Sequence, residues 1–281
     1  MSTMRTSGVS TSGRGFGVHD HVCWSYDDHA DFLARAVEFL TEGLHLGLRT
    51  AFVAPGAADE LRAQLSRAEP LARALADGAL TVESLDGVYG PDEVVDPETQ
   101  VAAYAAATEA ALAQGFRGYR VAAEATALVR TPRQLEQFTR YEHRVDRYMV
   151  THPFSALCAY RRDELDPSAV AQLAGLHPAA SPDATPFRLH AGSDGTLTLA
   201  GELDFSSAET FPLVLERAGL PGGRVVIDGH DLEFVDHRSL WALADAAARR
   251  DATVVLRTGH PGVERLLGLL DVPRVTVERT A

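Results

Sequence analysis

Short apolar segments alternate with amphipathic segments along most of the chain, and this pattern limits the possible fold more than any other feature. The apolar segments have the length and composition of buried strands, whereas the segments between them repeat apolar residues every three or four positions. Strands separated by helices form a largely parallel sheet with helices on both faces, so the pattern predicts an α/β fold. The expected strands lie at 21–26, 48–54, 80–85, 119–123 and 154–160, and the expected helices begin near residues 28, 57, 98 and 131.

The length of 281 residues exceeds what one hydrophobic core usually serves, which favours two domains. The run GLHPAASPDATP at 175–186 contains three prolines and few core-forming residues, so we expect a flexible linker there. It would separate a domain at 18–174 from a smaller α/β domain at 187–281, and residues 1–17 would form a disordered tail. In the second domain we expect strands at 187–190, 197–203, 224–228, 252–256 and 275–277, a turn at 192–195, and helices at 206–218, 237–250 and 261–270.

The charge balance excludes two classes of partner. There are 39 acidic residues against 26 basic ones, which gives a formal net charge of −13 at pH 7. A surface of this sign repels phosphate backbones and anionic lipid head groups, so we expect no nucleic-acid partner and no membrane partner. All basic residues are arginine. Schiff-base enzymes, pyridoxal-phosphate anchors and Walker A nucleotide sites need a lysine and are therefore excluded.

The two cysteines indicate the compartment. Cys23 and Cys158 both stand among apolar residues, and two isolated cysteines in a chain of this length are typical of a reducing environment. Residues 1–17 lack the apolar core of a signal peptide, and no window approaches the roughly 18 consecutive apolar residues of a transmembrane helix. We therefore expect a cytoplasmic protein.

Segments of the first domain occur in the order of a known family. They are His21-Val-Cys-Trp-Ser-Tyr26, residues 44–54, the strand Arg120-Val-Ala-Ala-Glu124, and Phe154-Ser-Ala-Leu-Cys-Ala-Tyr160 followed by His177. With these segments residues 19–177 resemble the MEDS domain, a sensory module named from methanogen, methylotroph and dichloromethane-regulator proteins. The resemblance implies a RecA-like, three-layer core without a phosphate loop and a site for a small hydrocarbon derivative, and we expect no cofactor. The turn at 26–29 agrees, because it contains neither glycine nor lysine.

The ligand site is expected beside the first strand of this domain. Alternate residues of a strand share one face, and a carboxylate that ends another strand lies where open α/β sheets bind ligands. We predict a mostly apolar pocket for a small organic ligand, bounded by His21, Cys23, Tyr26, Glu124 and Cys158. In a purely structural role, Glu124 would cap the next helix or pair with an arginine.

Two alternatives involve other chemistry. His19, His21 and Cys23 stand at every second position, and imidazole with thiolate is a ligand set for zinc, copper or iron. Together with Cys158, His21 and Cys23 would form a metal, haem or thiol-redox sensor. A second ligand pair such as Cys-x2-Cys is absent, however, and buried cysteines pack well in cores. The other alternative is a residual nucleotide-binding RecA-like protein, which the missing lysine disfavours.

The helix expected at 131–149 carries charges at a spacing of four residues. Glu136, Arg140 and Arg144 stand one turn apart, and Glu142 lies near them. Such spacing stabilises the exposed surface of a helix. We therefore interpret this charged face as solvated.

Three runs of the second domain also follow the order of a known family. LTLAGELDFSSAETF contains Gly201-Glu-Leu-Asp204, RVVIDGHDLEFVDHRSLWAL contains the junction Phe234-Val-Asp236, and ATVVLRTGHPGVERLLGLLDV contains the helix at 266–270. With these runs residues 187–277 resemble a STAS domain, the fold of bacterial anti-anti-sigma factors. The resemblance implies docking onto an anti-sigma factor or a kinase-like regulator. The implied docking face consists of Asp204, Asp236, His237, Arg238 and Ser239.

The junction departs from the family at the phosphorylated position. Where the family has Asp-Ser-Ser-Gly, this chain has Asp236-His237-Arg238-Ser239. The acceptor serine is replaced, and Ser239 is rotated by about 100 degrees around the helix, so we expect no switch by phosphorylation. Arg238 either presents a cation to a partner carboxylate or belongs to a solvated helix start.

Together these observations predict a non-enzymatic sensor and regulator. A small organic ligand would bind the MEDS-like domain, which would control the binding of the STAS-like domain to an anti-sigma factor or related partner. We expect the control to work by reorientation of the two domains about the flexible linker at 175–186, because interfaces within one chain are usually modest and polar.

Overall fold

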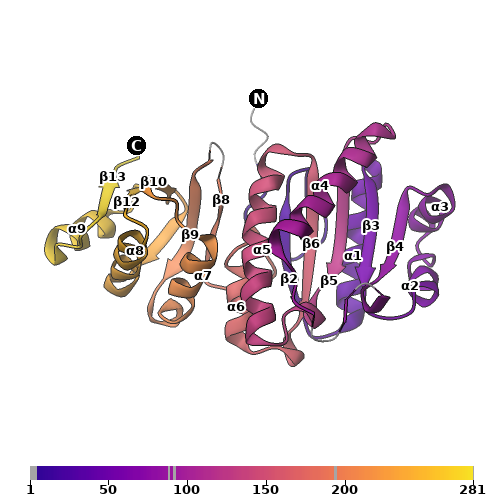
Figure 1. Ribbon diagram of the computed structural model, residues 1–281, viewed down its shortest axis with the longest axis horizontal. Coiled ribbons are helices and arrows are strands. Elements are labelled where there is room, and N and C mark those ends of the chain that lie inside the picture. Colours follow the sequence, from indigo (N-terminus) through magenta and orange to yellow (C-terminus); the bar gives the residue numbers. More distant parts are fainter. Residues whose placement is uncertain (1–4, 88, 91–92, 193–194, 281) are drawn as a thin grey trace.

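The chain folds into two α/β units that follow one another along the longest axis of the molecule (Figure 1). The computed structural model describes residues 5–87, 89–90, 93–192 and 195–280. Residues 1–4 of the expected tail and 193–194 of the expected turn lie outside this part. The first unit is built on a seven-stranded sheet and the second on a six-stranded sheet, which confirms the α/β class.

The seven-stranded sheet is parallel in all its described strand pairs. Its order is β1-β7-β2-β6-β5-β3-β4, so β2 lies inside the sheet with a neighbour on each side. Parallel neighbours need crossover connections, and helices supply most of them here. The strands are β1 (Gly8–Val9), β2 (His21–Tyr26), β3 (Arg49–Ala54), β4 (Leu80–Ser84), β5 (Tyr119–Glu124), β6 (Phe154–Arg161) and β7 (Ala179–Ala180).

Two layers of helices enclose this sheet. Alternate residues of β2 join different hydrophobic clusters: Val22 and Trp24 pack with α1, α2 and α3, whereas Cys23 packs with α4, α5 and α6. The first unit therefore has three layers. None of the described helices has the length and apolar character needed to cross a membrane. The helices are α1 (His29–His45), α2 (Ala58–Leu65), α3 (Glu69–Asp77), α4 (Pro97–Ala113), α5 (Pro132–Thr151) and α6 (Pro167–Ala174).

Local signals fix where the site-bearing helices begin. The Asp28 carboxylate caps α1 by accepting a hydrogen bond from the backbone N–H of Ala30 at 2.9 Å. Thr131 and Gln134 form a reciprocal capping box at the start of α5, with Pro132 at its first position. These caps satisfy backbone N–H groups that have no partner within the helix.

The second unit has a mixed sheet with one antiparallel hairpin. β8 (Phe187–Ala191) and β9 (Leu197–Leu203) pair antiparallel, and the other described pairs are parallel. The other edge of β9 is shared, because β10 pairs with its first residues and β11 with its last. The remaining elements are β10 (Gly223–Asp228), β11 (Leu232–Val235), β12 (Ala252–Arg257), β13 (Val275–Glu278), α7 (Thr210–Ala218), α8 (His237–Arg249) and α9 (Pro261–Leu270).

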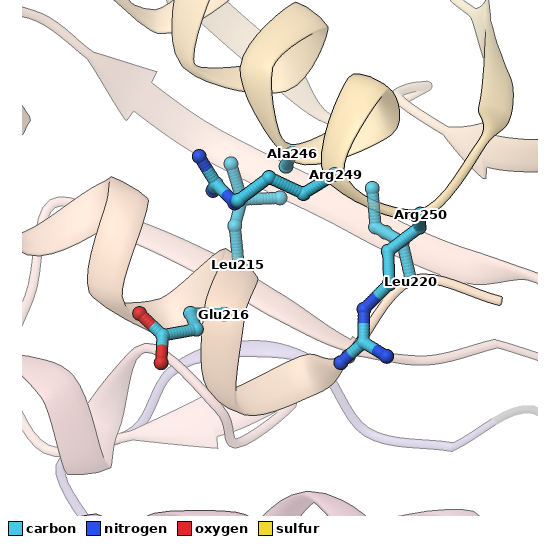
Figure 2. Close-up of a pocket in the computed structure, with 7 residues that line it drawn as sticks. Leu215, Glu216, Leu220, Ala246, Arg249 and Arg250 are labelled. Carbon is cyan, nitrogen blue, oxygen red and sulfur yellow. The ribbon is translucent and has the colours of Figure 1, made fainter. Parts of the chain in front are cut away.

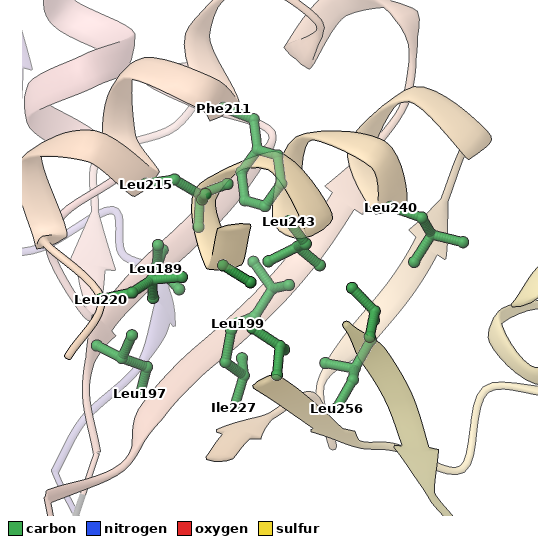
Figure 3. Packing of buried hydrophobic residues seen from close by; sticks show 14 of the residues in the cluster. Leu189, Leu197, Leu199, Phe211, Leu215, Leu220, Ile227, Leu240, Leu243 and Leu256 are labelled. Atoms are coloured by element: carbon green, nitrogen blue, oxygen red, sulfur yellow. The ribbon is translucent and has the colours of Figure 1, made fainter. Parts of the chain in front are cut away.

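Leucines dominate the core of the second unit (Figure 3). Leu189 and Leu199 of the hairpin belong to one hydrophobic cluster with Phe211 of α7 and Leu240 of α8, and all four side chains are fully buried. Leu176, which precedes β7, belongs to the same core. The hydrophobic core of the second unit therefore begins inside the segment that was expected to be a linker.

The segment 175–186 is not the flexible linker that its composition predicts. Leu176 and His177 are fully buried, and β7 pairs with β1 on one side and β2 on the other. The backbone N–H of Leu189 donates to the carbonyl of Gly175 at 2.6 Å. The prediction was wrong because small residues can also form a buried strand. The backbone groups of β7 are satisfied by pairing with β1 and β2, so this segment can be buried without large apolar side chains.

Residues 5–17 are not a disordered tail. Two carboxylates of α1, Glu38 and Glu42, accept hydrogen bonds from the backbone N–H groups of Gly13, Gly15 and Phe16 at 2.9 to 3.0 Å. The polar composition of this stretch predicted disorder. Its backbone N–H groups are nevertheless satisfied, because two carboxylates of α1 accept hydrogen bonds from them. The stretch is thereby held against the first unit.

The two units contact each other through α5. Glu136 and Arg140 on this helix form ion pairs with Arg217 and Glu216 on α7, at 3.3 and 3.5 Å. α5 also packs against β8, and α6 packs against α7. The units are docked against each other, so the expected reorientation about a flexible linker has no structural basis.

Candidate functional site

Four side chains that can ionise meet in the interior of the first unit. His21 comes from β2, Glu142 from α5, Cys158 from β6, and His177 from the segment between α6 and β7. All four are buried. Glu142 Oε2 lies 3.2 Å from His21 Nε2 and 3.7 Å from both Cys158 Sγ and His177 Nε2. We call these four residues the buried polar cluster.

Strand alternation and register bring the cluster together. His21 and Cys23 stand at alternate positions of β2, and parallel pairing places Cys158 of β6 opposite Cys23. Glu142 lies on the buried face of α5, which covers this side of the sheet. The His177 ring reaches the same place, with its centroid 3.9 Å from that of His21. Four separate elements are therefore needed to build the cluster.

Further hydrogen bonds orient His177 and Glu142. His177 Nδ1 donates to the carbonyl of Leu173 at 2.8 Å, which leaves Nε2 without a proton and turned toward the cluster. The Tyr160 hydroxyl donates to Glu142 Oε1, so Oε2 is the oxygen that faces the cluster. Within the described part of the chain, His177 Nε2 has no hydrogen-bond partner. A buried acceptor atom is therefore available at the centre.

Asp146 holds the other side of His21 and reaches the second unit. Its Oδ1 lies 3.3 Å from His21 Nδ1 and pairs with the Arg5 guanidinium, while Oδ2 accepts a hydrogen bond from the backbone N–H of Ala191 at 2.8 Å. Burial raises the pKa of Asp146, but the charge of Arg5 and the hydrogen bond to His21 outweigh it and hold the pKa well below 3.8. Asp146 is therefore an ionised link between the cluster and β8.

Burial and neighbouring charges set the protonation states of the cluster. Burial lowers the pKa of His21, but hydrogen bonds to Asp146 and Glu142 outweigh it and raise the pKa above 6.5. Burial, with the charge of His21, lowers the pKa of His177 to about 4. Burial and the nearby Glu142 carboxylate raise the pKa of the Cys158 thiol well above its usual value. At neutral pH the cluster therefore holds a neutral His177 and a protonated Cys158 thiol.

A small cavity lies beside the cluster, between the sheet and helices α4 and α5. Its volume is about 40 Å³, and its walls include Tyr104, Phe138 and Phe154. Apart from tyrosines, the ionisable side chains that line the cavity are the Glu124 carboxyl group and the Cys158 thiol. A cavity of this size holds about three water-sized groups. It fits a molecule of very few heavy atoms.

Tyr26 and Glu124 meet where β2 and β5 end. Glu124 Oε1 accepts hydrogen bonds from the Tyr26 hydroxyl at 3.2 Å, from the backbone N–H of Thr126 at 3.3 Å, and from the Thr126 hydroxyl. Burial raises the pKa of Glu124 against the effect of these bonds. The carboxylate is thus held by hydroxyl and amide groups at the edge of the cavity.

The five residues predicted to bound one pocket are divided between two neighbouring sites. Glu124 and Cys158 line the cavity, and Tyr26 contacts Glu124 from outside it. His21 belongs to the buried polar cluster, and Cys23 is fully buried in the adjoining core. Cys158 belongs to both sites. The cavity and the cluster therefore share one wall.

His19, His21 and Cys23 do not form the metal-ligating set that their spacing allows. His19 Nδ1 contacts the carbonyls of Met149 and His152, each at 2.8 Å, at the end of α5. The ring is held by backbone acceptors there, outside the buried polar cluster. This alternative, which the spacing left open, is not realised, because the strand pattern alone does not determine which partners the end of α5 offers to His19.

Glu142 and His177 were not predicted as site residues. The charge spacing of α5 indicated a solvated face, but Glu142 is fully buried. A signal was present in the sequence, because Glu142 follows Phe138 by four positions and precedes Met149 by seven, in line with the apolar stripe of the helix. His177 stood in the expected linker. A carboxylate within an apolar helical stripe is the pattern that identifies such a site.

The junction residues of the second unit differ in accessibility. Asp236 caps α8 and accepts hydrogen bonds from the backbone N–H and the hydroxyl of Ser239, both at 2.8 Å. Ser239 is 2% exposed, so its inclusion in the predicted docking face was wrong. His237 and Arg238 are exposed, and Asp204 caps the helical turn after β9. A helix cap buries the hydroxyl that a partner or a kinase would need.

Exposed aromatic side chains lie near these residues in the sequence. Phe205 is 76% exposed, Phe234 45% and Trp241 40%. The guanidinium carbon of Arg238 lies 5.2 Å from the centroid of the Phe205 ring, as in a cation–π contact. Large exposed aromatic side chains are typical of interaction surfaces.

A separate cleft lies between α7 and the last turn of α8 (Figure 2). Its volume is about 430 Å³, and Figure 2 shows Glu216, Arg249 and Arg250 at its sides. It lies at the opposite end of α8 from Asp236. The cleft was not predicted from the sequence, and it is distinct from the predicted docking face.

A family comparison covers most of the first unit. The family described as MEDS, MEthanogen/methylotroph, DcmR Sensory domain, matches residues 20–178, which is more than half of the chain. The chain belongs to the MEDS family. The MEDS match includes the whole buried polar cluster and every residue that lines the small cavity. It ends before β8 and leaves the second unit outside the match, and no curated protein matches the chain.

Proposed function

We propose that this protein is a non-enzymatic sensory regulator in which the MEDS domain binds a small organic molecule and the second unit transmits the binding state to a protein partner. The observation that carries the proposal is the position of α5. Phe138 and Tyr141 on this helix line the cavity, while Arg140 and Asp146 contact the second unit. A ligand that displaces α5 changes these contacts directly, because packed helices shift as units.

The cavity supports a ligand with very few heavy atoms. Its volume is about 40 Å³, and aromatic and aliphatic side chains make up most of its lining. Glu124 and Cys158 add a polar edge. A halogenated or oxygenated compound of one or two carbons satisfies both the size and the polarity, in keeping with a sensory domain for small hydrocarbon derivatives.

The second unit supports an output through protein binding. We propose that it is a STAS-like domain, on its sequence resemblance at 201–204 and at the Asp236 junction, and that its partner is an anti-sigma factor or kinase-like regulator. Phe205 and Arg238 offer an exposed ring and a cation to that partner. Ser239 is buried, so the proposal includes no release by phosphorylation.

The turn after β2 supports a function without nucleotide binding. Asp28 caps α1, and Asp27 pairs with Arg162 at 2.6 Å. Two carboxylates thus stand where nucleotide-binding folds present backbone amides to phosphate.

Cys23 and Cys158 are free thiols, which supports the cytoplasmic location that we propose.

Thermal unfolding of the full chain tests ligand binding, with methanol, dichloromethane and formate as probes. We expect at least one of them to raise the unfolding midpoint, because a ligand that binds only the folded state stabilises it. Ala123→Val fills part of the cavity and should abolish the rise, whereas Ala122→Val, on the opposite face of β5, should keep it. A panel without effect, or an effect that survives Ala123→Val, contradicts this site.

Binding to an anti-sigma kinase domain tests the output. We expect Arg238→Glu to weaken binding by about 1–2 kcal/mol, the range of a charged contact, without changing the unfolding midpoint. Arg249→Glu, at the other end of α8, is the matched control and should bind normally. Equal affinities of both variants and the unchanged chain would assign Arg238 to a solvated helix start.

A further inference from the structure

We propose that the buried polar cluster is a metal site for one divalent transition ion, with zinc as the best match. The ligand atoms are His21 Nε2, Glu142 Oε2, Cys158 Sγ and His177 Nε2, which lie within 4.8 Å of one another. Two nitrogens, one oxygen and one sulfur form a donor set of borderline softness. The site adjoins the organic-ligand cavity, with which it shares Cys158, but the proposal does not depend on whether that cavity binds a ligand.

The distances between the four ligand atoms suit tetrahedral coordination. Zinc holds nitrogen and oxygen ligands at about 2.0–2.2 Å and thiolate at about 2.3 Å, which separates ligand atoms by about 3.3–3.8 Å in a tetrahedron. Glu142 Oε2 lies 3.2 Å from His21 Nε2 and 3.7 Å from His177 Nε2. Cys158 Sγ lies 3.6 Å from His21 Nε2 and 3.7 Å from Glu142 Oε2. These separations leave room for an ion at the centre after small side-chain movements.

The outer hydrogen bonds are those of oriented metal ligands. In metal sites the second nitrogen of a histidine usually donates to a carboxylate or a backbone carbonyl, which turns the first nitrogen toward the ion. His21 Nδ1 faces Asp146, and His177 Nδ1 donates to the carbonyl of Leu173. Tyr160 holds the oxygen of Glu142 that points away from the cluster. The outer contacts therefore point three ligand atoms inward.

An independent observation is the unsatisfied nitrogen of His177. This side chain is fully buried, and its Nε2 has no hydrogen-bond partner among the described residues. A buried polar atom without a partner costs about 1–3 kcal/mol, so such atoms are rare in folded proteins. A metal ion at the centre of the cluster supplies the missing partner.

Charge balance also favours a divalent ion. With Cys158 as thiolate and Glu142 as carboxylate, two negative charges offset the two positive charges of the ion, so the filled site is neutral in a buried environment. Binding releases the thiol proton of Cys158, and the proton on His21 Nε2 that faces Glu142 leaves with it. Asp146 keeps its hydrogen bond to the other nitrogen of His21.

Metal titration of the full chain tests the site. The protein is stripped with a chelator and then titrated with Zn²⁺, or with Co²⁺ so that the thiolate-to-metal absorption can be followed. We expect one equivalent to bind, with visible bands of tetrahedral cobalt and a higher unfolding midpoint. His177→Gln should weaken binding at least tenfold, and Cys158→Ser should remove the thiolate band. Cys23→Ser is the matched control, because Cys23 is equally buried but is not one of the four ligands.

Three results would overturn the proposal. They are the absence of stoichiometric binding by the unchanged chain, a cobalt spectrum without a thiolate band, and equal loss of that band in Cys23→Ser and Cys158→Ser. Circular dichroism of each variant separates lost coordination from lost folding. Because no organic compound is present in this experiment, its outcome is independent of the proposed sensing of small organic molecules.

Discussion

The carboxylate of Asp146, on helix α5 of the MEDS domain, accepts a 2.8 Å hydrogen bond from the backbone N–H of Ala191, on strand β8 of the second unit. The other oxygen of the same carboxylate faces His21 and Arg5. Three segments far apart in the sequence therefore converge on one buried charge. A change at the buried polar cluster has a direct route to the hairpin of the second unit.

We expect Asp146→Asn to destabilise the protein by about 3–5 kcal/mol. The substitution leaves the charges of Arg5 and His21 buried without their anion. Removing one partner of a buried ion pair lowers the free energy of unfolding by this amount. Urea unfolding of the full chain measures the change. Glu136→Gln is the control, because Glu136 is 40% exposed in its ion pair with Arg217 and should cost less than about 1 kcal/mol. Equal effects of both variants would contradict the role of Asp146.

Acid should destabilise the protein through His190 of β8. Burial, with the charges of Arg5 and Arg188, lowers the pKa of His190 to about 4 despite the nearby Asp146 carboxylate. The unfolded chain binds a proton near pH 6.5 and the folded chain does so only near pH 4. The stability that this histidine contributes is therefore present above pH 6.5 and is lost as the pH falls toward 4.

The size of this effect follows from the pKa difference. One pKa unit corresponds to about 1.4 kcal/mol, so His190 should account for a loss on the order of 3 kcal/mol by pH 4. In urea unfolding at a series of pH values, His190→Gln should make the fall in stability between pH 6.5 and 4 less steep, while His177, whose pKa is also about 4, keeps part of it. A variant that loses stability as steeply as the unchanged chain would show that His190 does not titrate in this way.

Arg120 should hold the N-terminal segment in place. The guanidinium of this fully buried side chain donates to Ser155 Oγ at 2.9 Å and to the carbonyls of Phe39, Phe16 and Gly17 at 3.1, 2.7 and 2.6 Å. Arg120→Met removes these four hydrogen bonds at once. We expect a loss of about 3 kcal/mol or more in unfolding free energy and rapid proteolysis within residues 5–17.

Arg49→Met is the matched control for that experiment. Arg49 is only partly buried, and among the described residues its guanidinium makes one hydrogen bond, to Gln114 at 2.7 Å. Its removal should change stability by less than about 1 kcal/mol and leave the N-terminal segment resistant to protease. Similar digestion of the two variants would mean that the carboxylates of α1 hold the segment without Arg120.

Incubation with ATP and an anti-sigma kinase should leave the intact mass of the protein unchanged. Ser239 is 2% exposed, and its hydroxyl donates to the Asp236 cap at 2.8 Å, so a kinase would have to unwind the start of α8 to reach it. Mass spectrometry of the intact chain checks this. A mass increase of one phosphate located at Ser239 would contradict it.

The fold was predictable where strong signals are local. β2 and α9 have the predicted bounds, 21–26 and 261–270, because an apolar strand and a proline-initiated helix are both defined by adjacent residues. β1 and β7 are two residues long and exist only through pairing between segments far apart in the sequence. Composition therefore assigned β1 to a disordered tail and β7 to a flexible linker, and both assignments were wrong.

The candidate site was predictable only in part for the same reason. Strand alternation and strand ends identified His21, Glu124 and Cys158, which depend on one element each. Glu142 and His177 become site residues only when α5 and the segment before β7 fold onto β2. The spacing along α5 places Glu142 on the buried stripe of the helix, but it does not report which residues from other elements reach the carboxylate.

Hydrogen–deuterium exchange of the full chain tests most directly the claim that α5 couples the MEDS cavity to the second unit. Exchange is measured with and without whichever of methanol, dichloromethane and formate raises the unfolding midpoint most. We expect changed protection of α5 together with the Ala191 amide and helix α7. A change confined to residues that line the cavity, or no change with any of the compounds, would contradict it.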